Sequence, residues 1–199
     1  MNGKTHQIVG ITLGVAASTI LHKTTGMSLF NAIPLIACSS AGSYIPDIDH
    51  VGSKLGKKLP ILSWPISGMS KLFKFLYSKT KWKIFDHFGE MFEHRGILHA
   101  PLFWTLIFGL IFSCVLPLIV VPLAAELFTY AMIGLTVGVG GHLLADMLNP
   151  TGIPLFMPFV NKKFRLARIR TGSLSESVFL IFAILCLFAS LIGAFIIIA

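Results

Sequence analysis

The sequence predicts an all-α fold: an integral membrane helical bundle of about five transmembrane helices with a basic amphipathic interfacial segment. Three observations predict it. The chain of 199 residues is 55% hydrophobic, with a mean hydropathy of +0.83. Only 12% of its residues are charged, whereas a soluble domain carries about 25%. Its longest apolar stretches reach the roughly 20 residues that a helix needs to cross a bilayer. We expect a single membrane-embedded domain over residues 1–199.

Five apolar stretches are the predicted spans. In chain order they are residues 8–21, 29–45, 101–125, 127–148 and 177–199. The second is rich in small residues, which suits a helix packed among other helices. Pro117 is expected to kink the third, because proline lacks the N–H group that a helix uses. Cys38, Cys114 and Cys186 lie singly inside these stretches, so we expect neither a disulfide framework nor a thiolate metal site.

The basic residues assign an orientation to these spans. With the N-terminus inside, fifteen of the 16 Lys and Arg residues fall on the cytoplasmic side, and Lys23 alone falls outside. This distribution follows the positive-inside rule. It predicts a multi-pass protein of the cell (inner or plasma) membrane with a cytoplasmic N-terminus and an outer C-terminus. The same rule and contact with anionic lipid account for the net charge of +8, so we expect no nucleic acid partner.

A basic insertion, at about residues 54–92, separates the second and third predicted spans. Its stretch "SKLFKFLYSKTKWKIFDHFGEMFEH" mixes Lys with aromatic and aliphatic residues at spacings near one helical turn. This pattern is typical of one or two amphipathic helices that lie on a membrane surface and bind anionic lipid headgroups. A solvated helical face packed on the protein is the alternative.

Histidine and acidic residues gather at the cytoplasmic ends of the predicted spans. The candidate ligands among them include two residues of "YIPDIDH", two of "EHRGILHA" and two of "GHLLAD". Because Lys and Arg alone set the orientation, this placement is an independent observation. It predicts that five helix ends meet and form one site. The residues are His6, Asp47, Asp49, His94, His99, His142, Asp146 and Glu176.

These eight donors predict a metal centre. Imidazole and carboxylate ligands without thiolates suit zinc first, with manganese, iron or magnesium as alternatives. One catalytic zinc uses three protein ligands and a water, so the surplus predicts two ions or additional partners of the ligands. His142 and Asp146 are four residues apart and share one helical face. Asp47 and Asp49 are expected to face the same way in an extended turn after Pro46.

Some of these residues also have a purely structural interpretation. His6 is compatible with an interfacial histidine, and His99 with a residue that caps or packs at a helix start. Asp49 is compatible with a cap of the following turn. Glu176 lies in "SLSE", which fits a capping box with Ser173 as the N-cap residue.

Arginine residues near these donors predict anion binding. Arg95 directly follows His94, and Arg170 precedes the "TGS" at the start of the last predicted helix. The free N–H groups of a helix start attract anions, and the planar guanidinium suits phosphate. We therefore expect Arg95 and Arg170 to hold phosphate oxygens. Gly96, between His94 and His99, predicts a break before the following helix begins.

The motifs "PDIDH", "HRGILHA", "GHLLADMLNPTG" and "RIRTGSLSE" together resemble the YdjM-like family of predicted membrane-bound, metal-dependent hydrolases. The resemblance covers nearly the whole chain, with the four motifs in order. That family is distantly similar to zinc-dependent phospholipases C and related nucleases. Those are helical enzymes with His and Asp ligands on clustered metals, including an H-x-x-x-D helix like that of His142 and Asp146. The resemblance implies hydrolysis of a phosphoester by metal-activated water.

The leading interpretation is a metal-dependent hydrolase that cleaves a phosphoester in a membrane lipid or lipid-linked phosphate substrate at the cytoplasmic face. Bound metals would lower the pKa of a water molecule, and Asp49 or Glu176 would accept its proton. One alternative is an ion- or proton-coupled transporter. The position of the ionisable residues, at one membrane face and not near the midplane, argues against it. The other is a non-catalytic membrane scaffold with structural metals.

Overall fold

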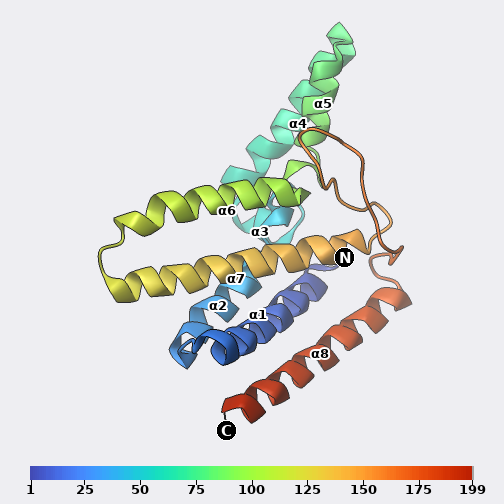
Figure 1. Ribbon diagram of the computed structural model, residues 1–199. Helices are drawn as coiled ribbons and strands as arrows, with labels where there is room; N and C mark the ends of the chain where they lie inside the picture. The colour runs from blue at the N-terminus through green and yellow to red at the C-terminus, as the bar shows by residue number, and fades with distance from the viewer. Residues whose placement is uncertain (199) are drawn as a thin grey trace.

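The computed structural model describes residues 1–198 and contains, within that range, eight α-helices and no β-strand (Figure 1). Five helices form the bundle: α1 (Gly3–Thr25), α2 (Leu29–Gly42), α6 (Pro101–Val115), α7 (Pro122–Met147) and α8 (Leu174–Ile198). Three more lie between α2 and α6 along the chain: α3 (Lys54–Lys58), α4 (Pro60–Thr80) and α5 (Lys83–Met91). The predicted all-α membrane bundle is confirmed.

Within residues 1–198, four segments are long and apolar enough to cross a membrane: α1, α7, α8 and the stretch Pro101–Leu118 that extends α6. The second predicted span is shorter than expected. α2 has 14 residues, which corresponds to about 21 Å of helix, against about 30 Å of bilayer hydrocarbon. It ends at Gly42 because the chain turns before Pro46. Residue 199, the last of the fifth predicted span, lies outside the described residues.

Two prolines set the boundary between α6 and α7. α6 ends at Val115, a short 3₁₀ turn (η3, Leu116–Leu118) follows, and α7 begins at Pro122. The prediction of one span over residues 101–125 is therefore wrong in its second half, where the helix does not continue. Pro117 lies beyond the helix end and does not kink it, because proline cannot continue the helical hydrogen bonding. Pro122 starts α7, where a missing N–H group costs nothing.

Glycines bring α2 and α7 into backbone contact. An added Cβ at Gly134 would lie 2.2 Å from the carbonyl oxygen of Leu35, and one at Gly138 would lie 2.0 Å from that of Ser39. Any side chain there would push the two helices apart. This close packing is common for membrane helices, in which small residues let backbones approach each other.

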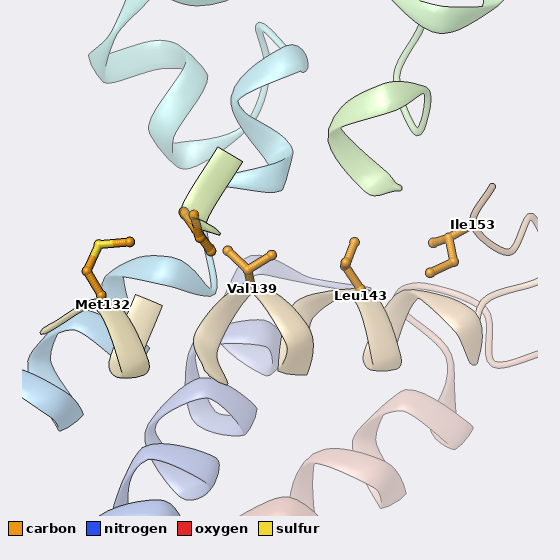
Figure 2. Close-up of a cluster of buried hydrophobic side chains, with 5 residues drawn as sticks. Met132, Val139, Leu143 and Ile153 are labelled. Carbon is orange, nitrogen blue, oxygen red and sulfur yellow. The ribbon is translucent and has the colours of Figure 1, made fainter. Parts of the chain in front are cut away.

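The apolar core lies on the side of α7 that faces α6. Figure 2 shows Met132, Val139 and Leu143 in a row on α7, with Ile153 beyond the helix end. Phe108 from α6 belongs to the same buried cluster. The outer side chains of α6 and α8 are largely apolar and exposed, which is the surface that a bilayer covers.

The insertion folds into helices, as predicted. α4 and α5 form a hairpin that extends away from the bundle beyond α6 (Figure 1). Lys81, with a φ of 58°, ends α4 at the turn. The Ser70 hydroxyl donates to the Gly89 carbonyl at 2.9 Å, and the Phe73 and Phe92 rings stack with centroids 6.0 Å apart.

Candidate metal centre

The ends of the five bundle helices meet at one place, as the distribution of ionisable residues predicts. α1 and α8 begin there and α7 ends there. The turn η1 (Pro46–Asp49) follows α2, and the turn η2 (Ile97–His99) precedes α6. These turns bring acidic residues and histidines against the last turn of α7.

His142 of α7 is oriented by a backbone carbonyl. Its Nδ1 lies 2.7 Å from the carbonyl oxygen of Ser43, so Nδ1 carries the proton and donates it. Nε2 is then unprotonated and keeps a free lone pair. The side chain is fully buried. Metal-binding histidines commonly have this arrangement, in which a carbonyl fixes the tautomer and the other nitrogen faces the ion.

The Nε2 atom of His142 faces three further donors. His99 Nε2 lies at 3.4 Å, Asp47 Oδ1 at 3.6 Å and Asp146 Oδ2 at 3.9 Å. His99 Nε2 also lies 3.5 Å from both Asp47 Oδ1 and Asp146 Oδ2. These distances exceed the usual N–H···O length of about 2.9 Å. Ligands about 2.1 Å from a tetrahedral zinc ion lie about 3.4 Å from one another, so the spacing fits an ion between them.

His6 approaches the same group from the first turn of α1. Its ring stacks on that of His142, with centroids 3.9 Å apart, and its Nε2 lies 3.3 Å from Asp146 Oδ1. Its Nδ1 is buried and has no hydrogen-bond partner among the described residues. An unpartnered buried nitrogen is costly, and it fits a site that a further ligand would complete.

Asp49 contacts the opposite edge of the His99 ring. Its Oδ2 lies 3.5 Å from His99 Nδ1 and accepts a hydrogen bond from the Arg95 backbone N–H at 3.2 Å. Its Oδ1 lies 2.9 Å from His94 Nδ1. Asp49 therefore orients His94, as carboxylates do for metal-binding histidines, and places negative charge beside His99 Nδ1, which has no hydrogen-bond partner among the described residues.

The turn that carries the two aspartates differs from the prediction. Residues Pro46–Asp49 form a 3₁₀ turn and not an extended segment. Asp47 and Asp49 consequently reach opposite edges of His99 instead of facing the same way. The break predicted at Gly96 is confirmed, since an added Cβ there would lie 2.1 Å from the carbonyl oxygen of Met91.

The charges in the turns are coupled. Burial would raise the pKa of Asp47 and of Asp49. Contacts with histidines, first with His99 for Asp47 and first with His94 for Asp49, hold both pKa values below the ordinary aspartate value. Burial would lower the pKa of His99, whereas its contacts with Asp47 and Asp49 outweigh burial and raise it to about 9. In the metal-free protein both carboxylates are therefore ionised near neutral pH and His99 is protonated.

Arg95 compensates the charge of Asp146. Its Nε lies 2.9 Å from Oδ2, and its Nη2 donates to Oδ1 at 3.2 Å. Its Nη1 also contacts the Thr151 hydroxyl. The side chain of Asn149 donates to the same Oδ1 at 2.6 Å. Because the Asp146 side chain is 1% exposed, its charge needs these partners.

Two predicted site residues lie outside this cluster. Glu176 Oε1 accepts hydrogen bonds from the Asn2 N–H and the Thr5 hydroxyl, and Oε2 accepts one from the Gly172 N–H. Glu176 thus joins the start of α8 to that of α1, and it belongs to none of the donor sets described below. The Arg170 side chain is exposed at the surface, and within residues 1–198 only its backbone carbonyl accepts hydrogen bonds, from the hydroxyl and the N–H group of Ser173.

In the part of the chain that the structure describes, three overlapping sets of donors have ligand atoms close enough to hold an ion. They are His6 with Asp47 and His142, Asp47 with His94 and His99, and His99 with His142 and Asp146. Asn149 and the Ser43 carbonyl were not predicted as partners. Asn149 has a sequence signal, since it lies one helical turn after Asp146. A backbone carbonyl has none.

A cavity of about 410 Å³ opens on the accessible side of the cluster. Asp47 is 21% exposed, whereas His99 and His142 are 0% exposed, so the cavity reaches the cluster at Asp47. Its volume falls in the range of roughly 300–1,000 Å³ that is typical of ligand pockets. The polar side chains that line it are Asn2, Tyr44, Asp47, His50, Ser53, Lys54, His94, Arg95 and Thr171.

Known proteins resemble this chain over most of its length. Residues 1–198 match the YdjM inner membrane protein family. An uncharacterized protein of Bacillus subtilis (strain 168), YvsG, is 30% identical over 180 residues, which are 90% of this chain and 88% of YvsG. The inner membrane protein YdjM of Escherichia coli (strain K12) is 33% identical over 114 residues.

The alignment with the Escherichia coli protein covers 57% of this chain and 44% of that protein, and the YdjM of Shigella flexneri matches to the same extent. No solved structure matches this chain. The similarity to zinc-dependent phospholipases C stays a prediction. The family match and the four long apolar helices support a multi-pass membrane protein. The chain belongs to the YdjM inner membrane protein family.

Proposed function

We propose that this chain is a membrane-bound, metal-dependent hydrolase that cleaves a phosphoester in a lipid or lipid-linked substrate at the cytoplasmic membrane face. One observation carries the proposal. The Nε2 atoms of His99 and His142 lie 3.4 Å apart, with Asp47 and Asp146 oxygens at 3.5–3.9 Å. This donor set adjoins an open cavity at Asp47. Fixed ligands beside an open position are what a catalytic metal requires.

The donor set selects the kind of metal. His99, His142, Asp47 and Asp146 would hold one divalent ion, zinc first, with manganese, iron or magnesium as alternatives. Such an ion supplies an acidified water and polarises a phosphoryl group. A second ion, which the sequence predicts, would need His94 together with Asp47 and His99, so we propose one ion here and keep His94 for the proton.

Asp49 and His94 form a pair suited to accept a proton. His94 Nδ1 lies 2.9 Å from Asp49 Oδ1, and the side chains are 37% and 1% exposed, respectively. Asp49 therefore orients the ring from the buried side, and His94 accepts the proton from the attacking water on the cavity side. A histidine oriented by a carboxylate is the usual general base. This assignment replaces Asp49 and Glu176 as the proton acceptor.

Positive charge in the first cavity would bind the phosphate. Lys54 and Arg95 both line it. Lys54 would contact the phosphate directly, whereas Arg95, whose guanidinium already contacts Asp146 and Thr151, would add positive charge beside it. Arg170, which the sequence also suggested, lies outside this cavity wall. Positive charges in a cleft also raise the local concentration of an anionic substrate.

The bilayer would supply the substrate. The candidate centre lies at one end of the bundle helices, and the α4–α5 hairpin extends sideways from that end (Figure 1). The hairpin exposes Trp64, Leu72, Phe75 and Trp82 among its lysines. This surface suits insertion among anionic lipid headgroups. The placement of Lys and Arg supports the cytoplasmic orientation.

The proposal is tested by metal content and lipid hydrolysis of the purified protein in detergent. Asp47→Ala and His142→Ala should each lose bound metal and phospholipid hydrolysis, because each removes one ligand. Asp86→Ala is the matched control, since it removes a carboxylate of α5, away from the centre. Retention of both metal and hydrolysis in the two ligand variants would refute the proposal.

One observation also favours a structural metal in a non-catalytic scaffold. His99, His142 and Asp146 are 0–1% exposed, and structural zinc sites are closed. X-ray absorption of the metal-loaded protein separates the two functions. Coordination by protein atoms alone, without a water ligand and without hydrolysis, would establish the scaffold.

A further inference from the structure

A second cavity, of about 520 Å³, lies between the η1 turn and the α4–α5 hairpin. His50, Gly52 and His94 line both this cavity and the first one. Asp49 also lines the second cavity, and it contacts His99 of the candidate metal centre. The two cavities therefore meet at His50, Gly52 and His94, and Asp49 contacts His94 from the second cavity.

The wall that α4 contributes is polar and basic. Ser67, Ser70, Lys71 and Lys74 line the cavity, and their spacing places them on one face of the helix. Phe75, which is 57% exposed, lies outside this set, as do the other exposed apolar residues of α4. The hairpin thus presents an apolar surface to its surroundings and lysines to the cavity.

The α4 side of the cavity carries Lys71 and Lys74, and the side facing it carries Asp49 and Glu93. Lys74 pairs with Glu93 at 2.8 Å. Asp49, the other acidic residue of the cavity, is already engaged by His94 at 2.9 Å and by the Arg95 N–H. No ion pair of the described residues 1–198 includes Lys71. Lys71 is therefore the charge available to an anion.

We propose that this second cavity binds a phosphate-type anion, with Lys71 as its main cation and the Ser67 hydroxyl as an additional donor. The inference rests on the proposed function and narrows its substrate class. A lipid whose scissile phosphoester lies in the first cavity would place a second phosphate against Lys71. The substrate is then a lipid with two phosphate groups, such as a lipid pyrophosphate. The volume of about 520 Å³ is sufficient for such a headgroup.

Phosphate binding by the metal-free, full-length protein tests this site apart from hydrolysis. Metal is removed with a chelating resin, and inorganic phosphate is titrated calorimetrically into the protein in neutral detergent. The wild type should bind phosphate, and Lys71→Gln should weaken binding about ten-fold, because a charge-assisted contact is lost. Lys79→Gln is the matched control, since Lys79 lies over the Phe75 ring at 5.6 Å and outside the cavity wall.

Two results would overturn the site: no phosphate binding by the wild type, or equal binding by the wild type and Lys71→Gln. A competition arm distinguishes a lipid headgroup from free phosphate. Dioctanoyl diacylglycerol pyrophosphate should displace phosphate, and dioctanoyl phosphatidylcholine should not. If neither displaces it, the site binds soluble phosphate and the lipid pyrophosphate assignment is wrong. Since no metal is present, a failure of the hydrolase proposal would not alter these results.

Discussion

Deprotonation of His99 is expected to destabilise the metal-free protein. Its contacts with Asp47 and Asp49 raise its pKa from 6.5 to about 9 despite burial. A group whose pKa is raised by folding contributes stability that is fully present below the unfolded pKa and is lost as the pH rises through the folded pKa. At about 1.36 kcal/mol per pKa unit, the change from 6.5 to about 9 corresponds to about 3 kcal/mol.

Thermal unfolding between pH 6 and 9.5, followed by tryptophan fluorescence in detergent after metal removal, measures this loss. One kcal/mol shifts the Tm of a chain of this size by roughly 2–4 °C, so we expect a fall of roughly 6–12 °C. Asp47 and Asp49 add no slope in this range, because their pKa values lie below the ordinary value. His99→Gln should lack the fall.

Zinc should reverse the trend. An ion binds only the deprotonated Nε2 of His99, so the stabilisation by added zinc should increase with pH over the same range. A Tm of the metal-free wild type that stays level or rises between pH 6.5 and 9 would refute this account of His99. An equal fall in His99→Gln would refute it as well.

Three substitutions, with Gly140→Ala as a control for the first, test other parts of the structure. Gly138→Ala should lower the Tm by separating α2 from α7, at a cost of about 1–3 kcal/mol, because its Cβ would lie 2.0 Å from a carbonyl oxygen. Gly140→Ala, with nothing within 4 Å, should leave the Tm unchanged, and equal effects would contradict the packing argument. Glu176→Ala should lower the Tm without loss of bound metal, since three hydrogen-bond donors lose their acceptor. If the variant folds but binds no metal, Glu176 is a metal ligand and the prediction is wrong. Arg95→Met should destabilise the metal-free protein by about 3–5 kcal/mol and the zinc-loaded protein by less, because zinc compensates the Asp146 charge; equal losses in both forms would contradict this.

The membrane helices follow largely from local sequence. A long apolar run must form a helix in a bilayer, because lipid offers its backbone no hydrogen-bond partners. α7 and α8 therefore lie close to the predicted residues 127–148 and 177–199. The gathering of ionisable residues at one end of these runs could also be predicted from the sequence, since few other positions in the chain combine charge with an apolar segment. Proline positions were visible too, but Pro117 ended a segment where a kink was expected.

What each ionisable residue does was decided by contacts between residues far apart in the chain. Glu176 and Asp146 are both buried carboxylates, yet Glu176 meets the N–H groups and hydroxyl of α1 and its own helix start, whereas Asp146 meets histidines and Arg95. The Ser43 carbonyl that orients His142 comes from 99 residues away. Composition and periodicity determined which segments enter the membrane and which side chains gather at their ends. Only the tertiary structure decided which side chains share a site, because ligand geometry depends on side-chain positions within a few tenths of an ångström that no local pattern encodes.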